Sequence, residues 1–198
     1  MYPGLGEHQP ALAVLWDRMG HTGPSDEELM ERYVHGADRA AFEELFRRYA
    51  APLDAMFRRT GSSEVEARDL IQQTFLQVHH ARNDFQQGLK FRPWLYAIAM
   101  NVGRGAHRRA RRRREDVVEP SAIDAVGVAP GTSSPTDRVV QRALERLPDD
   151  QQEVIVLHWF NGLEFQEIAN IVDASLSAVK LRAHRGYNRL REMLRGAA

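Results

Sequence analysis

Two stretches of Arg and Lys contain the residue types best suited to chemistry in this 198-residue sequence. Residues 101–114 include seven Arg and one His but no Asp or Glu, and residues 180–195 include six Lys or Arg against one Glu. The planar guanidinium fork of Arg bonds phosphate and guanine at two points. Both stretches therefore predict contact with a polyanion, and nucleic acid is the first candidate.

The surroundings of the first basic stretch could also distinguish bases. Phosphate binding is independent of base sequence, so discrimination has to come from other groups, near a polar loop at residues 83–88. The candidates there are Asn83, Phe85, Lys90 and Asn101. Phe85 could stack on an unpaired base, although a place in the core suits its composition equally well. Interaction with a helix dipole explains one or two of the seven Arg, but not all of them.

The second basic stretch follows the pattern of a helix-turn-helix. A short helix over residues 165–172, a turn at residues 173–175 and a long basic helix succeed one another. Asp173 is acceptable in such a turn because Asp tolerates left-handed backbone. The N-terminal half of such a second helix enters the major groove. We therefore expect Lys180, Leu181, His184 and Arg185 to project toward DNA; a merely solvated helix face is the alternative.

The wider pattern predicts an all-α protein, because apolar residues recur at three- and four-residue intervals and no alternating strand is found. Capping boxes at Ser25 and Ser63 mark two helix starts. A further helix over residues 42–57 contains Pro52, where we expect a bend, and another begins near Phe91. Four amphipathic helices of this kind are expected to form one bundle over residues 25–114.

A second helical domain is expected over residues 136–198, after a flexible acidic linker at residues 115–135. Residues 115–137 hold three Pro, two Gly and no basic side chain, and could reach about 75 Å when extended. That length equals about two turns of B-DNA. Residues 1–24 form an N-terminal extension whose short apolar stripe could dock on this chain or on a regulator.

The formal net charge of zero conceals a segregated distribution. Residues 1–40, 41–114, 115–153 and 154–198 carry balances of −4, +8, −6 and +2. The two basic segments coincide with the two domains that are expected to face DNA. The acidic segment between them coincides largely with the expected tether.

The composition argues against several classes of protein. The absence of Cys excludes disulfides and thiolate metal sites. No apolar run approaches the roughly 20 residues that cross a bilayer, and the N-terminus lacks a signal sequence, so we expect a cytoplasmic protein without membrane insertion. His79 and His80 point about 100° apart on a helix, which makes a metal site improbable. We expect no catalytic residue, no cofactor and no small-molecule substrate.

In the order and spacing of its motifs, the sequence resembles the extracytoplasmic-function class of bacterial RNA polymerase sigma factors. The segments AFEELFRRYAAPLDAMF, DLIQQTFLQV and FRPWLYAIAMN resemble the first domain of that family. The segment LPDDQQEVIVLHWFNGLEFQEIANIVDASLSAVKLRAHRGYNRLREML resembles its second domain. The resemblance covers residues 28–114 and 136–194. It implies a sigma factor that binds core RNA polymerase and promoter DNA, helps to open the duplex, and is controlled by an anti-sigma factor.

The resemblance also assigns roles to residues. Core-polymerase binding is assigned to Asp69, Gln72, Gln73 and Phe75. Binding of the minus-ten element is assigned to Asn83, Phe85, Lys90, Asn101, Arg104, Arg108 and Arg109. Reading of the minus-thirty-five element is assigned to Lys180, Leu181, Arg182, His184 and Arg185. The chain departs from the family at Gln73, where an acid is usual, at His79, where Trp is usual, and at Leu181, where Ser is commoner.

The alternative interpretation is a helix-turn-helix regulator that binds duplex DNA without replacing the sigma subunit of polymerase. Such a regulator would need neither a basic first domain nor a face that docks on polymerase. An enzyme, such as a helical metal-dependent nuclease, is disfavoured because no His and carboxylate cluster has the spacing of metal ligands.

Overall fold

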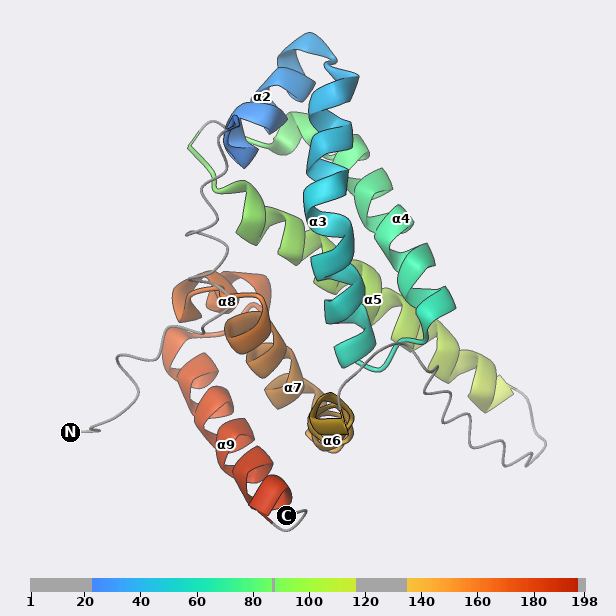
Figure 1. Cartoon of the computed structure of the whole chain (residues 1–198), viewed down its shortest axis with the longest axis vertical. Coiled ribbons are helices and arrows are strands. Elements are labelled where there is room, and N and C mark those ends of the chain that lie inside the picture. The colour runs from blue at the N-terminus through green and yellow to red at the C-terminus, as the bar shows by residue number, and fades with distance from the viewer. Residues whose placement is uncertain (1–22, 87, 117–134, 196–198) are drawn as a thin grey trace.

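The computed structural model describes residues 23–86, 88–116 and 135–195, and these residues form helices without a β-strand. The all-α expectation is therefore confirmed for the described chain. Most of the predicted N-terminal extension and of the predicted linker lies outside the described residues. Figure 1 shows one group of helices in the upper half of the molecule and a second group beneath it.

The upper group is built from long helices with local start signals in the sequence. It contains α2 (Asp26–Gly36), α3 (Arg39–Arg59), α4 (Glu64–His80), the 3-10 turn η1 (Arg82–Asp84) and α5 (Phe91–Asp116). Both predicted capping boxes form: the Ser25 and Ser63 hydroxyls accept from the backbone N–H three residues later, and Glu28 and Glu66 bond back. Helix α3 continues through Pro52 to Arg59.

The apolar stripes of these helices meet in one core. Its largest fully buried side chains include Phe57 on α3 and both Phe91 and Tyr96 on α5. The rings of Tyr49 and Phe91 pack edge to face with their centroids 5.5 Å apart. Full burial of each large apolar side chain is worth about 1.5–3 kcal/mol. This core fixes the N-terminal part of α5 in the bundle and thereby aims the basic tract that follows.

The lower group contains α6 (Pro135–Leu144), α7 (Asp149–Ile155), the π-helical turn η2 (Val156–Phe160), α8 (Phe165–Ile171) and α9 (Leu176–Arg195). The sequence predicts a helix that starts at Pro148, runs to Phe160 and stops at Asn161-Gly162, and the structure confirms these limits, although the backbone widens into the π-helical turn η2 in the second half. The backbone N–H and the side-chain amide of Asn161 both donate to the Val156 carbonyl, at 3.2 and 2.9 Å. These two bonds end the helix in a π turn.

The helix-turn-helix forms with the predicted chemistry. Asp173 adopts the left-handed conformation with a φ of 49°, and the Ser175 hydroxyl accepts from Ala178 N–H at 3.2 Å to cap α9. Val179 and Ala183 on α9 are buried with apolar residues of α8 in the same hydrophobic cluster. Gly186 lets α9 approach α7, because a Cβ there would lie 3.1 Å from Ile155 Cγ1.

The two groups of helices pack against each other. Helix α5 contacts α8, and α3 contacts η2. One hydrophobic cluster contains buried residues of both groups, such as Leu95 from α5 and Leu157 from η2. The side-chain amides of Gln141 and Gln152 donate to the backbone carbonyls of Arg58 and Arg59 at 2.9 and 3.1 Å.

Candidate nucleic-acid interface

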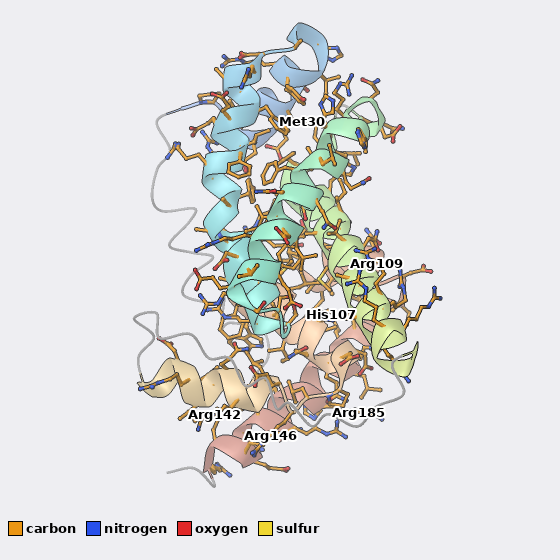
Figure 2. The ribbon with its side chains drawn as sticks, turned by 90° about the vertical axis from the view of Figure 1, so that its right-hand side faces the viewer. Met30, His107, Arg109, Arg142, Arg146 and Arg185 are labelled. Carbon is orange, nitrogen blue, oxygen red and sulfur yellow. The ribbon has the colours of Figure 1, made fainter. Side chains whose placement is uncertain are left out.

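The N-terminal half of α9 has one buried side and one exposed side. Val179, Ala183 and Gly186 are buried. The exposed residues on the opposite side are Ser177, Lys180, Leu181, His184 and Arg185. We call these five residues the α9 face. It includes four of the five residues predicted to read the minus-thirty-five element, and Figure 2 labels Arg185 among them.

Arg182, the fifth predicted reader, lies beside the α9 face rather than on it. Its Nε is 3.2 Å from Asp150 Oδ2 at the start of α7. Further along α9, Arg189 donates to the Gln151 side chain at 3.2 Å. Both bonds turn cations of α9 toward α7, so in this structure Arg182 helps to hold α9 in place.

The basic tract at the C-terminal end of α5 is open to solvent. Asn101, Arg108 and Arg109 are exposed, and Asn83 is exposed on η1. In Figure 2, Arg109 on α5 and Arg185 on α9 lie on the same side of the molecule, away from Arg142 on α6 and Arg146 in the turn that follows α6. The open tract and the α9 face could both contact nucleic acid phosphates.

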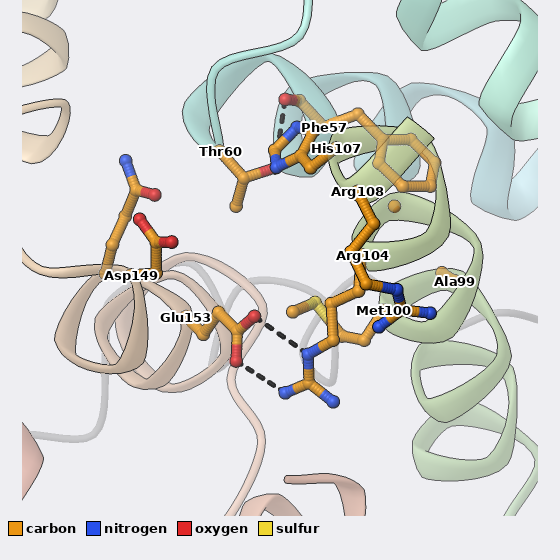
Figure 3. Close-up of a pocket in the computed structure, with 11 residues that line it drawn as sticks. Phe57, Thr60, Ala99, Met100, Arg104, His107, Arg108, Asp149 and Glu153 are labelled. Atoms are coloured by element: carbon orange, nitrogen blue, oxygen red, sulfur yellow. Dashed lines mark hydrogen bonds and ion pairs between the residues drawn. The ribbon is translucent and has the colours of Figure 1, made fainter. Parts of the chain in front are cut away.

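Arg104, within the same tract, is bonded to the other domain. Its Nε and Nη2 donate to the two carboxylate oxygens of Glu153 on α7 at 2.9 and 2.5 Å, as Figure 3 shows. The two side chains are 29% and 17% exposed. The hydrogen bond with Glu153 raises the pKa of the Arg104 guanidinium. The pair lines a cavity of about 290 Å³ between the domains, with His107 and Asp149 on its wall.

Lys90 makes a second ion pair across the domains. Its Nζ lies 3.3 Å from the Glu167 carboxylate on α8, and this hydrogen bond raises the pKa of Lys90. The Lys90 side chain is 69% exposed, so water screens the attraction. Two of the predicted minus-ten residues, Lys90 and Arg104, are thus paired with carboxylates of the second domain.

A buried polar contact joins the domains between these ion pairs. The Tyr96 hydroxyl donates to Asn161 Oδ1 at 2.8 Å, and Arg92 donates to the Asn161 backbone carbonyl. Burial raises the pKa of Tyr96 to about 12. Arg59 also stacks over the Phe160 ring at 4.3 Å. These directional contacts fix the orientation of the two domains at an interface that is otherwise apolar.

Phe85 follows η1 and points inward. It is 8% exposed, and its ring packs edge to face on Trp94 with the centroids 5.2 Å apart. The sequence left base stacking and a core place equally open for this residue. In this structure the Phe85 ring is buried in the core, where it is not accessible to a base.

Helix α4 carries the predicted polymerase contacts on its outer side. Asp69, Gln72 and Gln73 are exposed there. Phe75 is buried instead, with its ring edge-on to Phe42 at 5.8 Å, and it also contacts Phe46 at 4.8 Å. Phe75 therefore holds α4 against α3 and offers no surface to a partner.

Sequence reasoning missed apolar residues on the same side of α4. Leu76 is 51% exposed and Val65 is also exposed, and both share a face with Asp69 and Gln72. Phe46 on α3 is partly exposed beside Phe75. The sequence did indicate that Leu76 could be exposed, because Leu76 lies outside the apolar stripe of its own helix.

No metal site and no membrane span emerges from the described chain. Residues 23–116, apart from 87, and 135–195 contain no group of three or more His, Asp or Glu arranged to hold a metal ion. His79 is engaged with the Tyr33 hydroxyl, whose oxygen lies 2.5 Å from Nδ1. Among the described helices, none has the length and apolar character that crossing a bilayer requires.

Comparisons with known proteins give two matches, one in each group of helices. Residues 45–113 match the family described as Sigma-70 region 2, and residues 137–190 match Sigma-70, region 4. The chain is 39% identical over 171 residues to the RNA polymerase sigma factor CarQ of Myxococcus xanthus, covering 83% of this chain and 95% of that protein. It is 32% identical to the ECF RNA polymerase sigma factor SigM of Mycobacterium tuberculosis, covering 86% and 85%.

A solved structure has the same architecture. The sigma factor RpoE of Bartonella quintana, determined in complex with the anti-sigma factor NepR, matches with a TM-score of 0.70 and 26% identity. The match covers 78% of this chain and 96% of that one. The expected fold of two small helical domains is thereby confirmed.

Proposed function

Because the chain belongs to the extracytoplasmic-function (ECF) class of sigma-70 factors, we propose that it binds core RNA polymerase in the cytoplasm, directs it to specific promoters and assists their opening. The observation that carries the proposal is the pairing of an exposed face on α4 with a basic helix-turn-helix face in one chain. The protein acts by binding alone, with no catalytic residue, cofactor or small-molecule substrate.

The first domain, residues 25–114, has two tasks in this proposal. Asp69, Gln72 and Gln73 contact core polymerase, together with the exposed Leu76, while Phe75 keeps α4 in position. The minus-ten element binds on the other elements of the domain. Its contacts are Asn83, Lys90, Asn101, Arg104, Arg108 and Arg109, and Phe85 would join them if its ring left the core.

The second domain, residues 136–198, reads the minus-thirty-five element through the α9 face. Lys180 and Arg185 can bond guanine O6 and N7 or phosphate oxygens, and His184 can bond either. Arg182 supports this face through Asp150. Exposure of these groups along the first half of α9 fits the way a second helix of this motif enters the major groove.

Promoter binding requires the two domains to separate. The elements named minus-ten and minus-thirty-five lie about 25 base pairs apart, or about 85 Å along B-DNA at roughly 3.4 Å per pair. In the structure α5 contacts α8, which is joined to α9 by the four residues 172–175. The contacts of Lys90 and Arg104 with the second domain must therefore break before both elements are bound. The acidic linker, at about 75 Å when extended, together with the breadth of the domains, can span the distance.

We assign control of this state to an anti-sigma factor. The structural relative RpoE was determined in complex with such a protein, which supports a similar partner here. A protein that bound the closed arrangement would hold Lys90 and Arg104 away from DNA.

Run-off transcription with purified core polymerase tests the proposal. Core polymerase with the protein should produce a promoter-specific transcript that neither component produces alone. Tight binding to bare duplex with no transcript from any template would instead favour the polymerase-independent regulator. The templates can be chosen by mapping transcripts genome-wide after overexpression of the protein.

A further inference from the structure

Leu181 is the one apolar residue on the α9 face, whose other four members are polar. Leu181 is 48% exposed and belongs to neither hydrophobic cluster of the described chain. It is the sixth of twenty residues in α9, within the half of the helix that enters the groove. Scattered apolar residues are normal on surfaces, but this one lies in the middle of a cationic, DNA-facing patch.

The neighbours of Leu181 set where its side chain would lie on DNA. Ser177 precedes it by four residues and Arg185 follows it by four, so the three share one side of the helix. Lys180 and His184 lie on the same exposed face. If these polar groups contacted phosphates or base edges, the Leu181 side chain between them would face the base edges in the groove.

The chemistry of the groove limits what Leu181 can recognise. Its side chain forms no hydrogen bond, so facing the donors and acceptors of a G·C pair would desolvate them without replacement. The apolar group that base edges present in the major groove is the C5-methyl of thymine. We therefore propose that Leu181 selects a thymine in the minus-thirty-five element by contact with its methyl group. This inference rests on the proposed function.

The proposal predicts a defined effect of a single methyl group. Uracil pairs as thymine does but lacks the C5-methyl. Removal of one methyl from a buried contact should weaken binding about four-fold. Replacement of the whole A·T pair by G·C should weaken it by about ten-fold or more.

The experiment uses holoenzyme assembled from core polymerase and the full chain. Duplex fragments that this holoenzyme selects from a random pool supply the minus-thirty-five sequence. Each thymine of that sequence, on either strand, is then replaced singly by deoxyuridine, and the affinity of the holoenzyme is measured. One position should show the four-fold loss with the wild-type protein, and this loss should vanish with Leu181→Ala.

A matched variant separates methyl recognition from general weakening. Lys180→Ala, on the same face, should bind more weakly overall while it retains the thymine-to-uracil ratio. Circular dichroism should be unchanged for Leu181→Ala, because the side chain is outside the core. Selected sites without thymine, no effect of uracil at any position, or a ratio that persists in Leu181→Ala would each overturn the inference while leaving the sigma-factor proposal intact. Absence of any promoter-specific binding would overturn both.

Discussion

Changing Glu153 and Glu167 to Gln together should loosen the contact between the two domains of the free protein. Each Glu pairs with a cation of the first domain, Arg104 or Lys90. Gln has nearly the shape of Glu but no charge, so it leaves packing in place and removes the ionic attraction. The substitutions also leave both cations intact for contact with DNA.

The expected magnitude follows from the geometry of the two pairs. The Arg104 pair has two charge-assisted bonds, at 2.9 and 2.5 Å, between side chains that are mostly buried, and we assign it about 1.5 kcal/mol. The Lys90 pair is exposed and contributes about 0.5 kcal/mol. A loss of about 2 kcal/mol shifts the ratio of closed to open protein about thirty-fold toward the open form.

Distance measurement by fluorescence energy transfer can follow this shift. The sequence contains no Cys, so a pair of introduced Cys residues can be labelled without interference. Gln77 on α4 and Glu192 on α9 are exposed and suit this purpose. Transfer efficiency between dyes at the two sites should fall in the double Gln variant. Its affinity for a single-stranded oligonucleotide should rise, because Lys90 and Arg104 become available.

The matched control is a double Gln variant of Glu43 and Glu64. These residues pair with Arg39 and Arg68 inside single helices, so their loss changes the net charge equally without touching the domain interface. The control should gain DNA affinity through charge alone and keep high energy transfer. If both double variants gave the same transfer efficiency and the same gain in affinity, the reasoning would be refuted.

Three further perturbations test other parts of the structure. Leu76→Glu should lower co-purification of core polymerase by about ten-fold or more, since it places a charge on a partly apolar docking face; Gln166→Glu adds the same charge at an exposed position of α8 in the second domain, and equal losses would contradict the assignment. Gly186→Ala should be less stable than Gly36→Ala by about 1–3 kcal/mol in thermal unfolding, because the new Cβ at position 186 would lie 3.1 Å from a buried Ile side chain, whereas a Cβ at position 36 meets open space. Arg185→Ala should reduce discrimination among minus-thirty-five variants by about 1–3 kcal/mol in competition binding, and an unchanged ranking of promoters would argue against a base contact.

Local features of the fold were predictable because they depend on residues close together in the sequence. Each capping box needs a Ser and a Glu three residues apart, and the left-handed Asp173 needs only its own side-chain chemistry. The π turn η2 was missed even though it also forms locally. The amide of Asn161 competes for the Val156 carbonyl there, and apolar periodicity contains no signal for that competition.

The candidate site likewise has one part that could be predicted from the sequence and one part that could not. The exposed side of α9 followed from helical periodicity, because the apolar residues that face α8 leave one face for solvent. The roles of Phe75 and Phe85 did not follow, since an aromatic residue on a helix or loop suits a core and a binding surface alike. Both rings are buried against aromatic residues that the fold brings to them.

By itself the sequence determined the helices, their capped ends, the helix-turn-helix and the segregation of charge, and its motifs indicated the family. Only the tertiary structure decided which cations are free. Arg104 meets Glu153 across 49 residues and Lys90 meets Glu167 across 77, whereas Arg108 and Arg109 stay exposed. Those pairings depend on the packing of α5 against the second domain, which is set by the shapes of two hydrophobic surfaces. The apolar periodicity of each helix does not indicate which residues of the other domain it will meet.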